Sequence, residues 1–148
     1  MIIKGIAHTG ICVKNLEKSI EFYNGVLGFK VVDEPCDMVT DSEEGPAMGF
    51  GIDCQHRIAK LEAAPGQYIE LMEFGYPVSS IKAPLPLNAI GKHHLSYLID
   101  DVDAWVAKFK ELGLEVVYKP LPYETEQGTA YWAIVKDPDG IQIELMQE

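Results

Sequence analysis

The tetrapeptide IELM occurs twice in the chain, as residues 69–72 in "GQYIELMEF" and as residues 143–146 in "DGIQIELMQE". Apolar residues alternate with a glutamate in both copies, and this alternation has the period of a β-strand. Glu70 and Glu144 therefore share a strand face with methionine. An ionised carboxylate on such a face is costly to bury unless a positive group binds it. Each copy thus predicts a strand that presents a carboxylate to a cation.

An internal repeat places the two IELM strands in equivalent positions. When His8 is placed on His94, HTGICVKNLEKSIEFYNGVLGFKVV aligns with HLSYLIDDVDAWVAKFKELGLEVV. Gly28 then falls on Gly113, just past the end of an apolar helical pattern in each copy. The histidine precedes the IELM glutamate by 62 residues in the first half and by 50 in the second. The halves therefore share an order of elements and differ in loop length.

The pattern of each half predicts a βαβββ module, with Asn15 and Asp101 as the helix caps. The acidic segment 33–49 is expected to be a loop. The fold class is α+β, with a single domain over residues 1–148. The expected strands are 3–13, 29–33, 56–63, 67–74, 92–99, 114–118, 129–136 and 141–147. The expected organisation is module 1 at about 3–75, a linker at about 75–91 and module 2 at about 92–147.

Charge and cysteine usage limit the classes of partner. The formal net charge is −11, and a surface this acidic repels nucleic acid and anionic membranes. No apolar run is long enough to span a bilayer, and the first residues lack the long apolar core of a signal peptide. The 3 cysteines have neither CxxC spacing nor the pattern of a disulfide framework. We therefore expect a cytoplasmic protein that binds neither nucleic acid nor membrane.

Two histidines and two glutamates, one of each per half, form a candidate set of metal ligands: His8, Glu70, His94 and Glu144. Imidazole and carboxylate together suit a divalent transition ion, and this set differs from the cysteine-rich ligation of structural zinc. A single His or Glu in a strand is more often a surface residue or a paired core residue. The repeat register favours a metal site because it sets both pairs in equivalent places.

The segments HTGICVKNLEKSIEFYNGVLGF, HHLSYLIDDVDAW and DPDGIQIELM resemble the vicinal oxygen chelate superfamily. This superfamily includes type I glyoxalases, methylmalonyl-CoA epimerases, extradiol dioxygenases and the fosfomycin and bleomycin resistance proteins. The resemblance implies that both modules form one cup-shaped, barrel-like mixed sheet around the metal. It also implies four metal ligands, His8, Glu70, His94 and Glu144. The metal expected is one divalent ion per chain: nickel, cobalt, manganese, iron or zinc.

The four-ligand set is most similar to bacterial type I glyoxalases, the lactoylglutathione lyases. This similarity implies proton abstraction next to a carbonyl through a metal-bound enediolate, from a thiol adduct of a 2-oxoaldehyde. Glu144 is then the base, with Glu70 as the alternative. The dipeptide HH at 93–94 resembles the epimerases instead, and it would make the substrate an acyl-CoA. An extradiol dioxygenase and a metal-free binding or resistance protein are the further alternatives.

Side chains near the two glutamates are candidates for the wall of a substrate pocket. Met72 and Phe74 share a strand face with Glu70, and Met146 shares one with Glu144. Tyr131 is a fourth wall candidate. Each half also has an open sheet edge and an apolar helix face, which this family commonly buries between chains. The expected assembly is therefore a homodimer.

Overall fold

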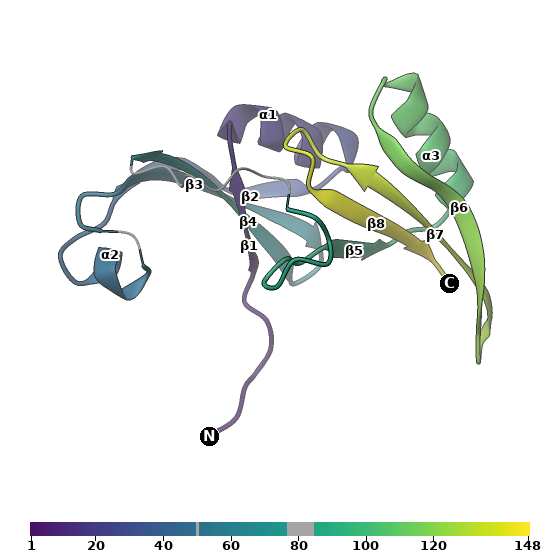
Figure 1. Ribbon diagram of the computed structural model, residues 1–148, viewed down its shortest axis with the longest axis horizontal. Helices are drawn as coiled ribbons and strands as arrows, with labels where there is room; N and C mark the ends of the chain where they lie inside the picture. The colour runs from purple at the N-terminus through teal and green to yellow at the C-terminus, as the bar shows by residue number, and fades with distance from the viewer. Residues whose placement is uncertain (50, 77–84) are drawn as a thin grey trace. The chain divides into compact units, whose positions relative to one another are not determined.

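The computed structural model describes residues 1–49, 51–76 and 85–148, and it divides into two units, Met1–Ile81 and Lys82–Glu148 (Figure 1). Unit 1 contains β1 (Thr9–Val13), α1 (Leu16–Ile20), the π-helix η1 (Glu21–Val26), β2 (Lys30–Val39), α2 (Glu44–Ala47), β3 (Gln55–Ala64) and β4 (Gln67–Tyr76). Unit 2 contains β5 (Leu95–Leu98), α3 (Val102–Glu111), β6 (Val116–Thr125), β7 (Gly128–Lys136) and β8 (Gln142–Gln147). The prediction of an α+β fold with two βαβββ modules is confirmed, with α2 as an insertion in the first.

Two further predictions concern how the units are joined: the single domain over 1–148 and the shared cup-shaped sheet. Both stay predictions, and the part of the expected linker at 77–84 lies outside the described residues. None of the helices in the described residues has the length and apolar character needed to cross a bilayer.

The two units have the same sheet topology. In the described residues each unit forms one four-stranded sheet, in the order β1-β4-β3-β2 in unit 1 and β5-β8-β7-β6 in unit 2. The first strand of each unit pairs in parallel with the last, and the other neighbours are antiparallel. A parallel pair cannot be joined by a tight hairpin, so the chain must cross back between its two strands. This shared topology confirms the internal repeat.

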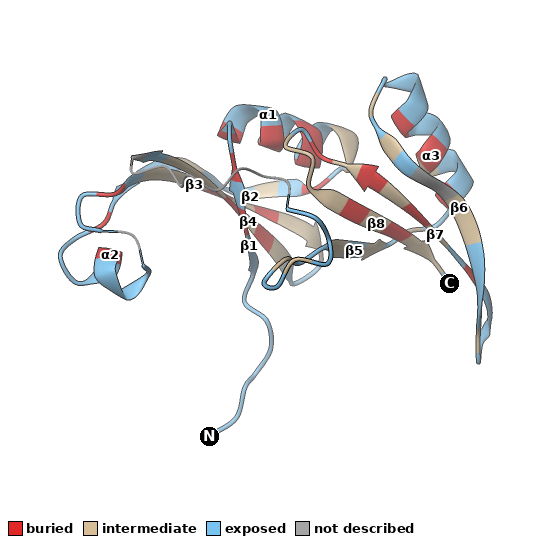
Figure 2. Ribbon diagram, viewed as in Figure 1, coloured by how far each residue is buried: buried red, intermediate tan, exposed pale blue. Residues whose placement is uncertain are grey.

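One face of each sheet is covered by the helix of the same unit, and Figure 2 shows the buried residues as red bands on helices and strands. In unit 1, Leu16, Phe22 and Tyr23 are buried together with Leu61 and Leu71. The helical residues alternate with exposed ones at helical spacing, which accounts for the apolar stripe that covers the sheet. The opposite face of the sheet remains half-exposed.

In unit 2 the helix α3 buries Val102 and Val106 against Ala133 of β7. Leu145 of β8 is buried on the same face. Because successive residues of a strand point to opposite faces, this burial leaves Glu144 on the half-exposed face. The same alternation leaves Glu70 on the half-exposed face of unit 1. The two IELM glutamates therefore lie away from the helix-covered cores.

Both predicted helix caps are present. Oδ1 of Asn15 accepts a hydrogen bond from the N–H of Lys18, and Oδ1 of Asp101 accepts one from the N–H of Ala104, each at 2.9 Å. Each bond satisfies an N–H group that the helix itself leaves without an acceptor. The helix after Asn15 differs from the continuous α-helix expected, because its second part, η1, is π-helical.

Strands β2 and β6 are longer than expected. They continue to Val39 and Thr125, so part of the predicted loop at 33–49 is strand. Pro35 and Pro120 lie inside these strands, although proline cannot donate a hydrogen bond to a neighbouring strand. Both strands are at a sheet edge, where proline is tolerated, and the pairing register shifts beside Pro35 and Pro120. Pro122, also in β6, pairs in register with Tyr131. The edge position therefore explains how residues 33–39 can form a strand where a loop was predicted.

Candidate metal centre

In unit 1 a histidine and a glutamate from neighbouring segments lie side by side. Glu70 is on β4, and the residue opposite it on the parallel strand β1 is Gly10. His8 lies one residue before β1, and its Nε2 atom is 3.8 Å from Oε1 of Glu70. The exposed fractions are 41 % for the His8 side chain and 23 % for that of Glu70. Unit 1 thus brings together the first two of the predicted ligands in an accessible position.

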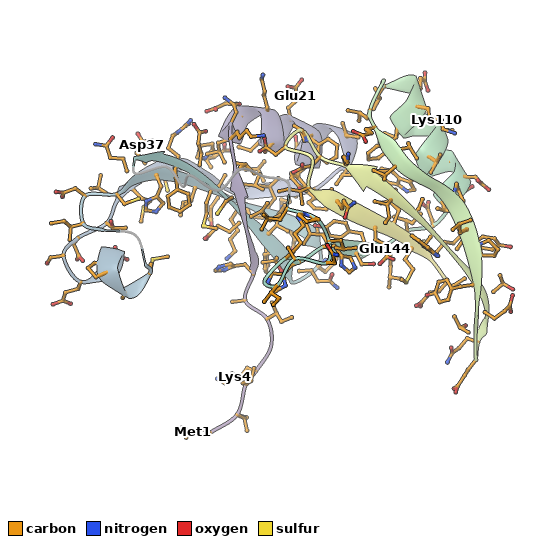
Figure 3. All side chains as sticks on the ribbon, viewed as in Figure 1. Met1, Lys4, Glu21, Asp37, Lys110 and Glu144 are labelled. Carbon is orange, nitrogen blue, oxygen red and sulfur yellow. The ribbon has the colours of Figure 1, made fainter. Side chains whose placement is uncertain are left out.

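Unit 2 repeats this arrangement. Glu144, labelled in Figure 3, is on β8, and the residue opposite it on β5 is Ser96. His94 lies one residue before β5, and its Nε2 atom is 3.7 Å from Oε2 of Glu144. The exposed fractions of the two side chains are 48 % and 20 %. The parallel pairing therefore produces the same His–Glu contact in both units.

Both pairs have the chemistry and the spacing that two ligands of one ion require. Nitrogen and oxygen donors bind zinc at about 2.0–2.2 Å, so two donors of one ion lie less than about 4.4 Å apart. The separations of 3.8 and 3.7 Å meet this limit. Within the part of the chain that the structure describes, no three His, Cys, Asp or Glu side chains gather into one group. Each unit therefore offers two ligands.

The face around Glu70 carries apolar and sulfur-containing side chains, together with Lys60 of β3. Met72 and Phe74 follow Glu70 along β4, as predicted, and both are partly exposed. A Cβ atom at Gly10 would lie 2.9 Å from Cε of Met72, so a larger residue would displace this methionine. The ring of Phe74 stacks on His56 of β3, with centroids 5.3 Å apart and planes at 20°. His56 was not predicted, because its place opposite Phe74 depends on the β3–β4 register.

The face around Glu144 differs from the prediction at one residue. Met146 lies on this face, and the residue opposite it on β7 is Trp132. Tyr131 lies opposite Gln147, whose side chain bonds to the start of α3, so Tyr131 is on the helix-covered face. The structure therefore places Trp132, and not Tyr131, beside Met146. Sequence alone could not choose between two adjacent aromatic residues without the register of β7 against β8.

A family model described as the glyoxalase/bleomycin resistance protein/dioxygenase superfamily matches residues 5–145. The chain belongs to this superfamily. The resemblance drawn from the repeated segments is thereby confirmed, since this is the group that contains the type I glyoxalases.

Other members of the superfamily resemble the chain over nearly its full length. A probable lactoylglutathione lyase of Vibrio cholerae is 34 % identical over 143 residues, covering 96 % of this chain and 89 % of that protein. A lactoylglutathione lyase of Neisseria meningitidis serogroup A is 31 % identical over 147 residues, covering 97 % and 90 %. A solved glyoxalase family protein from Bacillus cereus matches with a TM-score of 0.84 at 23 % identity, covering 100 % and 96 %. The names of the first two support a glyoxalase-family function, and the third shows the fold.

The strand register predicts that only the second histidine of the HH dipeptide is a metal ligand. Loss of a residue that only hydrogen-bonds to a metal ligand typically weakens metal binding roughly 10–100-fold. His94→Ala removes a proposed ligand itself, the nitrogen beside Glu144, so it should weaken Co(II) binding by more than this. His93→Ala is the matched control and should bind like the parent. Isothermal titration calorimetry measures both. Equal losses, or a loss only in the His93 variant, would show that the register is wrong by one residue.

Proposed function

We propose that this chain is a metal-dependent enzyme of the glyoxalase type that transfers a proton at a carbon next to a carbonyl. The observation that carries the proposal is the matched His–Glu contact, at 3.8 Å in unit 1 and 3.7 Å in unit 2. Superfamily membership and two relatives named as lactoylglutathione lyases support the same class of reaction. The proposed ligands of one divalent ion are His8, Glu70, His94 and Glu144.

The ligand chemistry admits nickel, cobalt, manganese, iron and zinc, because all of them accept imidazole and carboxylate ligands. Two carboxylates also balance the charge of a divalent ion, which favours this set beside the apolar side chains of Met72, Phe74 and Met146. When bound, such an ion supplies Lewis-acid catalysis, which lowers the cost of removing a proton next to a carbonyl.

We assign the role of general base to Glu144, with Glu70 as the alternative. The cross-strand neighbour of Glu70 on β3 is Lys60, whereas that of Glu144 on β7 is Ile134. Lys60, whose ammonium group lies 4.8 Å from the centre of the Tyr68 ring, brings a positive charge to the face of Glu70, whereas an apolar neighbour cannot compete for the Glu144 carboxylate. We therefore prefer Glu144 as the base. A carboxylate placed in this way contributes about 10²–10⁴-fold through general base catalysis.

The proposed substrate is a hemithioacetal, which is the adduct of a thiol with a 2-oxoaldehyde. Met72, Phe74 and Met146, together with Trp132 in place of Tyr131, supply apolar surface beside the two glutamates for the carbon skeleton of such a molecule. A second candidate is an acyl-CoA, because His93 precedes His94 as in the epimerases that the HH dipeptide resembles. Both substrates lose a proton next to a carbonyl, so one assay can compare them.

Replacement of the proposed base should separate binding from catalysis. Glu144→Gln keeps an amide oxygen that can still ligate a metal, but it removes the proton acceptor. We expect the variant to retain Co(II) or Ni(II) and to lose about 10²–10⁴-fold in rate. The assay offers the hemithioacetal of methylglyoxal and glutathione, and separately a racemisable acyl-CoA, in deuterated water. The parent should incorporate solvent deuterium at the α-carbon of the reactive substrate.

Glu70→Gln is the matched control for this experiment. A larger rate loss in Glu70→Gln than in Glu144→Gln would assign the base to Glu70. Absence of reaction and of exchange with both substrates, in every metal form, would contradict proton transfer and favour a binding protein. Oxygen consumption with a catechol would favour the dioxygenase alternative instead.

We also propose that the protein is a homodimer. Before β1, large apolar side chains are exposed, among them Ile3 at 94 % and Ile6 at 85 %. β1 lies at an edge of its sheet, and an open strand edge favours pairing with another chain. Sedimentation velocity at micromolar concentration should give about twice the 16.4 kDa mass of the chain. A monomeric mass would contradict the dimer and leave the metal proposal untouched.

We propose the cytoplasm as the location of this protein. Cys12, Cys36 and Cys54 are free thiols, two of them exposed, as expected for a protein of a reducing compartment.

A further inference from the structure

The residue that follows each IELM copy reaches across its unit to the start of the helix. Oε2 of Glu73 accepts a hydrogen bond from the backbone N–H of Leu16 at 2.6 Å. Oε1 of Gln147 accepts one from the backbone N–H of Val102 at 2.9 Å. Leu16 and Val102 are the first residues of α1 and α3, where the N–H has no acceptor within the helix. These two contacts, termed the helix–strand bonds, occupy equivalent positions in the repeat.

The helix–strand bond has the same sequence relation to the His–Glu pair in both units. The histidine precedes the first helical residue by 8 positions, and the glutamate precedes the acceptor residue by 3 positions. The first and last strands of a unit are therefore joined at one end by the His–Glu contact. At the other end they are joined by the helix–strand bond.

Glu73 and Gln147 share one chemical feature, a side-chain oxygen that can accept a hydrogen bond. Glu73 also lies 3.9 Å from the guanidinium group of Arg57, which Glu17 contacts at 2.7 Å. Arg57 is the residue opposite Glu73 on β3, whereas the residue opposite Gln147 on β7 is the uncharged Tyr131. Gln147 carries no charge. The position therefore requires a hydrogen-bond acceptor and does not require a carboxylate.

The register that keeps a glutamate beside its histidine is held by the fewest backbone pairs where the parallel strand pair is short. β5 has only 4 residues, and it pairs in parallel with β8. A slip of one residue along this pair would turn Glu144 to the helix-covered face, away from His94. Because β5 leads into α3, β8 cannot slide along β5 without breaking the bond from Gln147 to Val102. The helix–strand bond thus opposes the movement that would separate the ligand pair.

We propose that Gln147 and Glu73 are positioning residues, which keep the glutamate of their strand beside the histidine of the neighbouring segment. Their effect on metal binding rests on the proposed function. Their effect on strand register does not, and it can be measured on the protein without metal.

The test compares removal of the acceptor with exchange of the two residues between the halves. Gln147→Ala and Glu73→Ala remove the acceptor, whereas Gln147→Glu and Glu73→Gln give each half the residue that the other half uses. Co(II) is the probe, because its visible spectrum reports the ligand set as well as occupancy. The alanine variants should bind Co(II) roughly tenfold more weakly, with an altered spectrum. The exchanged variants should match the parent.

Asp101→Ala is the control for a general loss of stability in α3. It removes the side-chain cap of the same helix, α3, but leaves the bond between the helix and β8. We expect this variant to lose stability and to keep the Co(II) affinity and spectrum of the parent.

Hydrogen exchange tests the register without metal. The N–H of Ile99 bonds to the carbonyl of Met146 at 2.8 Å, at the end of the β5–β8 pair. This amide should exchange roughly fivefold faster in Gln147→Ala, as expected for loss of one hydrogen bond, and at the parent rate in Gln147→Glu.

Three results would overturn the proposal: parent-like Co(II) binding in the alanine variants, an equal loss in Asp101→Ala, or unchanged exchange at Ile99. A parent protein that binds no Co(II) would contradict the proposed function. The positioning role would then be decided by Ile99 alone: faster exchange in Gln147→Ala would support it, and unchanged exchange would overturn it.

Discussion

The parallel pairing of the first and last strands of each unit is the constraint on which the rest of the structure depends. It sets Gly10 opposite Glu70 and Ser96 opposite Glu144, and so brings each histidine to its glutamate across 62 and 50 residues of chain. A parallel pair also forces the chain to cross back, and the helix in that crossing covers one face of the sheet. The other face remains half-exposed and carries the candidate ligands. One pairing rule, used twice, therefore produces both the core and the candidate ligands.

The composition of the half-exposed faces is the physical basis of the proposed metal site. Glu70 and Glu144 are only 23 % and 20 % exposed, and they stand beside Met72, Phe74 and Met146. Partial removal of a carboxylate from water costs free energy, and apolar neighbours offer no hydrogen bond or opposite charge to offset this cost. In the proposed site, a divalent ion bound by both carboxylates would offset this cost. This balance of costs supports the proposed metal site.

Much of the fold, and the contact of each histidine with the glutamate of its own unit, could be predicted from the sequence, because the features involved are local or repeated. Asn15 and Asp101 cap helices through contacts three residues away, and the repeat aligned His8 with His94. Features that depend on the exact register of paired strands, or on side-chain contacts that the repeat does not mark, could not be predicted. Trp132 rather than Tyr131 faces Met146 because of the β7–β8 register, and the bonds from Glu73 and Gln147 span 57 and 45 residues. The acidic segment 33–49 was predicted as a loop, although 33–39 is strand, because the pairing of β2 at a sheet edge is a property of the sheet.

The central claim is that the two His–Glu pairs together hold one divalent ion, and metal content tests it most directly. The protein should be purified without chelator, and nickel, cobalt, manganese, iron and zinc measured by inductively coupled plasma mass spectrometry. The account predicts about one equivalent of these ions per chain, and almost none in the double variant His8→Ala/His94→Ala. A parent protein that carries no such ion, and takes up none when offered nickel or cobalt, would contradict it.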